Sequence, residues 1–139
     1  MKHVSLLLVA SALALSVTSG FAYERPRDAA RLARYEPFAG EPLKNIPYYT
    51  PMNWEVIDDQ NILVTMRPKV AYLMQIAGPC VRDHRGSPVL AISSAAGRVS
   101  AGFDRVTVGG HMTCKIEEIR AIDLVAMREA EKAGKEAEK

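Results

Sequence analysis

Short runs of β-branched and apolar residues, separated by turn-forming residues, fill the chain from 54 to 123 and constrain its fold more than any other feature. Two of these runs, 54–57 and 62–66, flank the polar stretch 58–61, which is typical of a loop joining two antiparallel strands. A third run, 70–77, alternates larger with smaller side chains, as a strand with two unequal faces does. Because no helical segment of ten or more residues separates consecutive runs, the pattern disfavours a parallel α/β sheet.

Further runs continue the pattern toward the C-terminus. Residues 89–92 form a short apolar stretch, and residues 99–103 and 106–108 alternate apolar with polar side chains. The segment 114–125 is ambiguous because its apolar residues recur every three positions, which also suits a helix; we expect a strand ending near Asp123. Six or seven short strands with short helices at both ends predict an α+β protein, mainly antiparallel β, whose small sheet curls into a barrel or sandwich.

The stretches around this pattern divide the chain into regions. Residues 23–53 should form a short helix and then an extended linker, because four prolines remove backbone donors and favour extended geometry. Residues 54–124 form the predicted core domain, and residues 125–139 a charged, solvated helical tail. Within the linker, Tyr48 and Tyr49 are expected to anchor the segment to its own domain, with a surface-docking patch as the alternative.

Residues 1–22 have the pattern of a secretory signal peptide. A positive start at Lys2 precedes the small and apolar stretch 4–17, which is short for a membrane-spanning helix. We expect cleavage after Ala22, so that the mature chain starts at Tyr23 and is periplasmic or secreted; a retained anchor is the alternative. No later apolar stretch approaches the length of about 20 residues that a spanning helix needs, so no integral membrane segment is expected after cleavage.

The chain has two cysteines, Cys80 and Cys114. In an oxidising compartment such a pair usually forms a disulfide, and this one would close a loop of about 35 residues, worth about 3.8 kcal/mol in the chain-entropy model. The alternative is a zinc site, because Cys80 and His84, together with His111 and Cys114, supply four ligands that zinc takes tetrahedrally. A redox-active role is disfavoured, since the cysteines do not form a Cys-X-X-Cys motif.

The sequence points to no catalytic and no cofactor-binding residues. It contains neither a glycine-rich phosphate loop nor a G-x-S-x-G motif. Asp58, Asp59, Asp83 and Asp104 could supply paired carboxylates for acid–base chemistry, but each lies in or beside a turn signal. We therefore expect these acids to stabilise turns or to face solvent.

Aromatic residues make up 6% of the chain, so the few present should contribute strongly to the core. We expect Trp54, Tyr72 and Phe103 to be its main anchors. A face on which a ligand stacks is the alternative.

Four segments of the chain together resemble a known pattern: W-E-V-I-D-D-Q-N-I-L-V (54–64), Y-L-M-Q-I-A-G-P-C (72–80), A-G-F-D-R-V-T-V (101–108) and C-K-I-E-E-I (114–119). This pattern resembles the DUF6491 family of small exported bacterial proteins of unknown function. The resemblance covers about residues 54–123 and leaves the linker and the charged tail outside. It implies an exported single domain with a cysteine pair, and it implies no activity.

These observations together predict a non-enzymatic periplasmic module that binds a protein or an envelope component through a sheet edge or a loop surface. A nucleic-acid partner is not expected, because the formal net charge is only +2. The alternatives are a Cys/His metal-binding protein and a small periplasmic hydrolase that uses aspartate and histidine. The partner, the biological process and the oligomeric state stay open.

Overall fold

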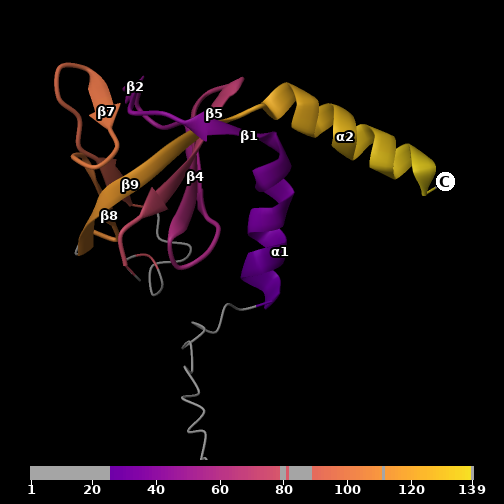
Figure 1. Ribbon diagram of the computed structural model, residues 1–139, viewed down its shortest axis with the longest axis horizontal. Helices are drawn as coiled ribbons and strands as arrows, with labels where there is room; N and C mark the ends of the chain where they lie inside the picture. Colours follow the sequence, from indigo (N-terminus) through magenta and orange to yellow (C-terminus); the bar gives the residue numbers. More distant parts are fainter. Residues whose placement is uncertain (1–25, 79–80, 82–88, 111, 139) are drawn as a thin grey trace, which may run out of the picture.

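A strongly bent antiparallel sheet forms the body of the protein (Figure 1). The computed structural model describes residues 26–78, 81, 89–110 and 112–138. Its helices are α1 (Pro26–Tyr35), the 3-10 turn η1 (Glu36–Phe38) and α2 (Leu124–Ala137). Its strands are β1 (Ala39–Pro42), β2 (Asn45–Pro47), β3 (Asn53–Val56), β4 (Asn61–Arg67), β5 (Val70–Ile76), β6 (Leu90–Ile92), β7 (Arg98–Ser100), β8 (Arg105–Val108) and β9 (Met112–Ile122).

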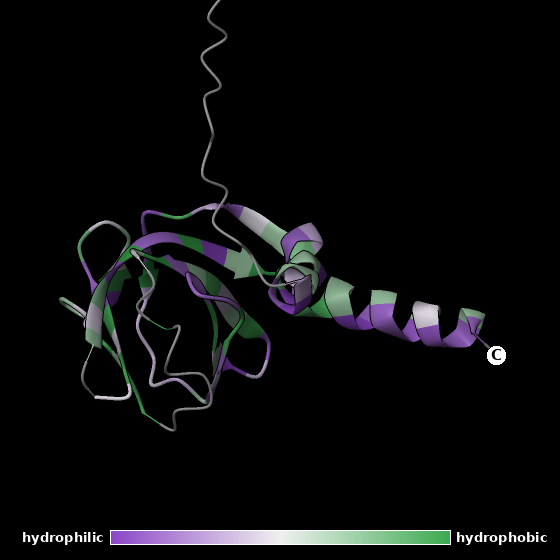
Figure 2. Cartoon of the chain, turned by 90° about the horizontal axis from the view of Figure 1, so that it is seen from below, coloured by the Kyte–Doolittle hydropathy of each residue, from purple (hydrophilic) through white to green (hydrophobic). Residues whose placement is uncertain are grey.

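The main sheet has seven strands, with the order β3-β4-β5-β9-β8-β6 and with β1 also paired to β9. The eleven-residue β9 organises it: one edge pairs with β5, and the other pairs first with β8 and then with β1. β2 and β7 form a separate two-stranded ribbon. Seen from below, the strands curve almost into a ring (Figure 2). The predicted α+β architecture, mainly antiparallel β with a short helix near each end, is confirmed.

Apolar side chains fill the inside of the bent sheet. Ile62, Met74 and Ile119 are fully buried there, and twelve other buried residues join the same cluster. A second cluster lies on the outer face of β4 and β5, where α1 and the start of α2 cover Leu63 and Leu73. Both faces of β4 and β5 are therefore buried, which explains why these two strands are almost continuously apolar in sequence.

α2 packs against the body only at its beginning. The carboxylate of Asp123 caps this helix by accepting hydrogen bonds from the backbone N–H groups of Val125 and Ala126. Leu124 and Met127 are buried, whereas residues 128–138 are exposed except for the half-buried Glu131. The helix projects away from the sheet, and hydrophilic residues lie along one side of it (Figures 1 and 2).

The structure agrees with the predicted runs and adds two strands. The runs from 54 to 123 form β3 to β9, and the ambiguous last segment is a strand that ends at Ile122. The stretch interpreted as a linker contains β1 and β2, whose terminal prolines, Pro42 and Pro47, leave the remaining backbone groups able to pair. Ile46 in β2 is buried in the inner cluster, so this stretch is part of the folded body.

The expectation that Phe103 anchors the core is wrong. β7 ends at Ser100, and the chain then turns through Gly102, which has a φ of +78° that glycine adopts without strain. Phe103 therefore lies in a turn rather than a strand, and 74% of it is exposed. Tyr72 is buried and Trp54 is half-buried against the inner cluster, as expected.

The expected signal peptide, residues 1–22, lies outside the described residues. Among the helices that the structure describes, none is both long and apolar enough to cross a membrane.

Candidate binding surface

Two of the predicted turn carboxylates are buried and stabilise turns. Asp58 accepts hydrogen bonds from the backbone N–H groups of Gln60 and Asn61, each at 2.7 Å, and from the side-chain amide of Asn61. Asp104 accepts from Ser93 Oγ at 2.6 Å and from the backbone N–H of Ser100 at 2.7 Å. Their oxygens thus close the β3–β4 loop and join the ends of β6, β7 and β8.

The structure describes part of the predicted cysteine and histidine set. Cys114 lies in β9 opposite Val106, half-buried beside the inner cluster. Cys80, His84 and His111 lie outside the described residues, so the disulfide and the alternative zinc site stay predictions. Asp83 lies outside them as well. Within the described ranges, no group of three or more histidine, cysteine, aspartate or glutamate side chains is arranged to hold a metal ion.

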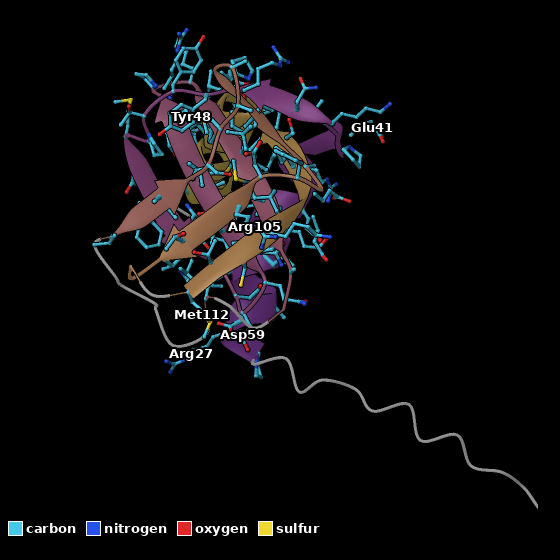
Figure 3. All side chains as sticks on the ribbon, turned by 90° about the vertical axis from the view of Figure 1, so that its left-hand side faces the viewer. Arg27, Glu41, Tyr48, Asp59, Arg105 and Met112 are labelled. Atoms are coloured by element: carbon cyan, nitrogen blue, oxygen red, sulfur yellow. The ribbon has the colours of Figure 1, made fainter. Side chains whose placement is uncertain are left out.

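Three connecting segments meet at one end of the sheet: residues 47–52, 67–69 and 95–98. The backbone N–H of Tyr48 donates to the carbonyl of Gly97 at 2.8 Å, which joins the first segment to the third. The N–H of Met52 donates to a carbonyl of β4 at 2.8 Å, next to the β4–β5 turn. Figure 3 shows Tyr48 at this end, whereas Asp59 and Met112 lie at the opposite end.

Cationic and apolar side chains lie next to each other on this end. The guanidinium of Arg67 lies over the ring of Tyr49, 3.6 Å from its centroid, a distance at which a cation and an aromatic face attract. Met52 is 64% exposed and Tyr49 38%. Arg128, in the first turns of α2, donates from Nη2 to the carbonyl of Pro68 at 3.2 Å. We call the surface formed by Tyr49, Met52, Arg67, Lys69 and Arg128 the basic rim.

The basic rim carries positive charge without neighbouring acids in its own loops. Residues 47–52, 67–69 and 95–98 include no aspartate or glutamate, and they include Arg67, Lys69 and Arg98. The β3–β4 loop at the opposite end contains two aspartates instead. A chain with a formal net charge of +2 therefore has a locally cationic surface, which its summed charge does not reveal.

The helix α2 continues from the rim with mixed charge. Arg128, Lys132 and Lys135 recur at the three- and four-residue spacing that places side chains on one helix face, and Glu131 stands at the same spacing among them. The carboxylate of Glu131 accepts a hydrogen bond from Nε of Arg34 at 3.0 Å. This contact also raises the pKa of Arg34. Arg128 is therefore the cation of α2 that a contact with the β4–β5 turn places at the rim.

The buried Tyr72 lies close to Tyr49 and Arg67 of the rim. Tyr72 in β5 is 8% exposed and belongs to the inner cluster. Burial, with a further contribution from the nearby Tyr49, raises the pKa of the Tyr72 phenol, although Arg67 acts in the opposite direction. The phenol therefore stays neutral at physiological pH and does not cancel the charge of the arginine.

A separate polar network joins α1 to β3. Glu55 forms an ion pair with Arg31 and accepts a hydrogen bond from the hydroxyl of Tyr35 at 3.2 Å. Burial and the adjacent Glu55 raise the pKa of Tyr35. These contacts fix the helix on the sheet, and we assign the network a structural role.

The family model of DUF6491, a family of unknown function, matches residues 1–138. The chain belongs to the DUF6491 family. The match is longer than the region 54–123 that the sequence resemblance covered, so the expectation that the linker and the tail lie outside the family is wrong. In the fold, β1 and β2 pair within the sheets, and α1 and the start of α2 pack on the outer face of the main sheet. No curated protein and no solved structure matches this DUF6491 chain.

Sequence reasoning identified one part of the basic rim. Tyr48 packs against the inner cluster, as expected of an anchor, whereas Tyr49 is partly exposed, so the anchoring role expected of both tyrosines holds for Tyr48. The cations were missed because Arg67 and Arg128 come from segments about 60 residues apart in the chain, which only the fold brings together. The one local signal in the sequence is Pro68 between Arg67 and Lys69, which suggests a turn with two cations beside it.

Proposed function

We propose that this DUF6491 protein is an exported, non-enzymatic accessory module that binds a component of the bacterial cell envelope through the basic rim. The observation that carries the proposal is the concentration of arginine and lysine beside the exposed Tyr49 and Met52 at one end of the sheet. Charged and apolar groups exposed together favour an anionic partner that also offers apolar surface.

The remainder of the fold is consistent with a supporting role for the sheet. Its inside is filled by fully buried side chains such as Ile62 and Ile119, so the described strands form a packed scaffold. The buried carboxylates of Asp58 and Asp104 are occupied in turns. The surface loops at the rim are held by backbone hydrogen bonds to this scaffold and can present their side chains in a fixed arrangement.

Export and envelope binding are tested together by expressing the full chain in a Gram-negative host. We expect the periplasmic fraction to yield a protein whose mass begins at Tyr23. Purified protein is then mixed with isolated cell envelopes and sedimented. The proposal expects the wild-type protein in the pellet; protein that stays in the supernatant would contradict it.

Two double variants identify the surface used. Lys69→Gln with Arg128→Gln removes two charges from the basic rim, and Arg105→Gln with Lys115→Gln removes two from the flank, where Arg105 is seen midway between the two ends (Figure 3). The second pair is exposed and lies on directly opposed positions of β8 and β9. We expect the first variant to lose sedimentation and the second to retain it. Equal behaviour of the two would refute binding through the rim.

A further inference from the structure

We infer that the basic rim is a docking site for the headgroup layer of an anionic phospholipid membrane. In this arrangement Tyr49 and Met52 enter the interfacial layer while Arg67, Lys69 and Arg128 contact lipid phosphates. The inference rests on the proposed function and specifies the envelope component that the rim binds.

The apolar members of the rim suit an interface between water and lipid. Tyr49 has a ring for apolar contact and a hydroxyl for the wet side, a combination that is enriched at the headgroup level of membranes. Met52 is the more exposed of the two, at 64%, and its unbranched side chain adapts to an irregular layer of lipid. Both residues lie on one short loop, so they can enter the same surface together.

The cations are arranged around these two residues. Arg67 is in direct contact with Tyr49, Lys69 is exposed in the adjoining turn, and Arg128 is hydrogen-bonded to that turn. A lysine or arginine near an anionic leaflet contributes about a fivefold gain in affinity. Three such residues together give about a 100-fold gain, without any contribution from the apolar side chains.

The cations of the rim come from two separate parts of the chain, since Arg67 and Lys69 stand at the β4–β5 turn and Arg128 belongs to α2. Beyond Arg128 the helix carries two lysines together with three glutamates, so it adds no net positive charge. The attraction to phosphates therefore depends on the three cations beside Tyr49 and Met52. A surface that offers several phosphates at once, such as a membrane, matches these three cations better than a small anion, which would contact one or two of them.

The experiment measures binding of the purified protein to vesicles of defined composition. One set contains phosphatidylglycerol with phosphatidylethanolamine, and the other contains phosphatidylcholine alone. We expect binding to the anionic vesicles that weakens at high ionic strength, because salt screens exposed charges, and far weaker binding to the zwitterionic vesicles. Equal binding to both sets would overturn the inference.

Variants connect the binding to the rim. Lys69→Gln with Arg128→Gln should weaken binding to the anionic vesicles about 25-fold. Arg105→Gln with Lys115→Gln, which changes the net charge equally, should keep the wild-type affinity. Met52→Ser should also weaken binding while keeping the dependence on salt, since it removes apolar contact and no charge. A rim variant that binds as well as the flank variant would refute the inference.

Comparison with isolated envelopes separates this inference from the proposed function. If the protein sediments with envelopes through the rim but ignores anionic vesicles, its partner is an envelope protein or polysaccharide, and the lipid inference fails alone. If it binds neither envelopes nor vesicles, both proposals fail. Circular dichroism of each variant confirms that a loss of binding does not come from unfolding.

Discussion

Replacing Asp104 with alanine should destabilise the protein strongly, because this buried carboxylate joins the ends of three strands. Asp104 is 3% exposed, and its two oxygens accept hydrogen bonds from Ser93 Oγ and from the N–H of Ser100. Ser93 Oγ in turn accepts from the N–H of Arg105 at 2.9 Å. One carboxylate therefore connects the end of β6, the end of β7 and the start of β8.

The magnitude follows from these contacts. A hydrogen bond to a charged acceptor contributes about 1.5–3 kcal/mol. Ser93 and Ser100 are not fully buried, so water partly replaces the lost acceptor, and we take the lower value for each bond. Asp104→Ala should then lower the free energy of unfolding by about 3 kcal/mol. At about 4 °C per kcal/mol for a domain of this size, the Tm should fall by about 12 °C.

Urea denaturation followed by circular dichroism measures this change. Asp104→Asn keeps the shape and one acceptor oxygen, and should cost about half as much. Glu117→Ala removes an acid from an exposed position of β9 and should change the free energy by less than about 0.5 kcal/mol. If Asp104→Ala were no more destabilising than Glu117→Ala, the assignment of this carboxylate as the link between three strands would be refuted.

Three further predictions concern the core, the pH dependence and the cysteines. Ile119→Ala, at a fully buried position, should cost about 3 kcal/mol in a urea titration, whereas Val125→Ala, at 51% exposure, should change stability by less than about 0.5 kcal/mol. The pKa of the Tyr35 phenol is raised in the folded state above its ordinary value of 10.0, so the unfolded chain loses the phenol proton at a lower pH than the folded protein does. The free energy of unfolding is therefore retained below pH 10.0 and falls as the pH rises through the folded pKa. Tyr35→Phe should reduce that alkaline loss by up to about 1.4 kcal/mol per pH unit. If the free energy of unfolding, measured by denaturation at several alkaline pH values, fell equally steeply in the wild type and the variant, the raised pKa of Tyr35 would not be the cause of the loss. Protein from the periplasm should have an intact mass two hydrogens below that of the reduced chain and should resist alkylation. Reducing the predicted bond between Cys80 and Cys114 should lower the free energy of unfolding by about 3.8 kcal/mol. Two alkylated thiols in the untreated protein would rule the bond out.

Much of the sheet could be predicted because its strands alternate or are continuously apolar. β3 to β5 and β8 follow directly from such runs, whereas the run that forms β9 also suited a helix because its apolar residues recur every three positions. β1 and β2 could not, because prolines in a segment favour an extended linker and a paired edge strand equally. Phe103 shows a related limit: the alternation continues to it in sequence, but the strand ends at Ser100.

The basic rim could be predicted only in part. Tyr49 was noticeable as one of two adjacent tyrosines in a proline-rich stretch. The charges that surround it depend on the β4–β5 turn meeting the start of α2, and that contact joins Pro68 with Arg128, 60 positions apart. Net charge is a sum over the whole chain, so a near-neutral value conceals such a separation of charge in space.

The measurement that tests the binding surface most directly is amide hydrogen exchange of the purified protein with and without isolated envelopes. Binding through the basic rim predicts slower exchange in residues 47–52 and 67–69 and at the start of α2, with no change in β8 on the flank. Slower exchange confined to the flank, or no change at the rim when the protein is bound, would contradict the account.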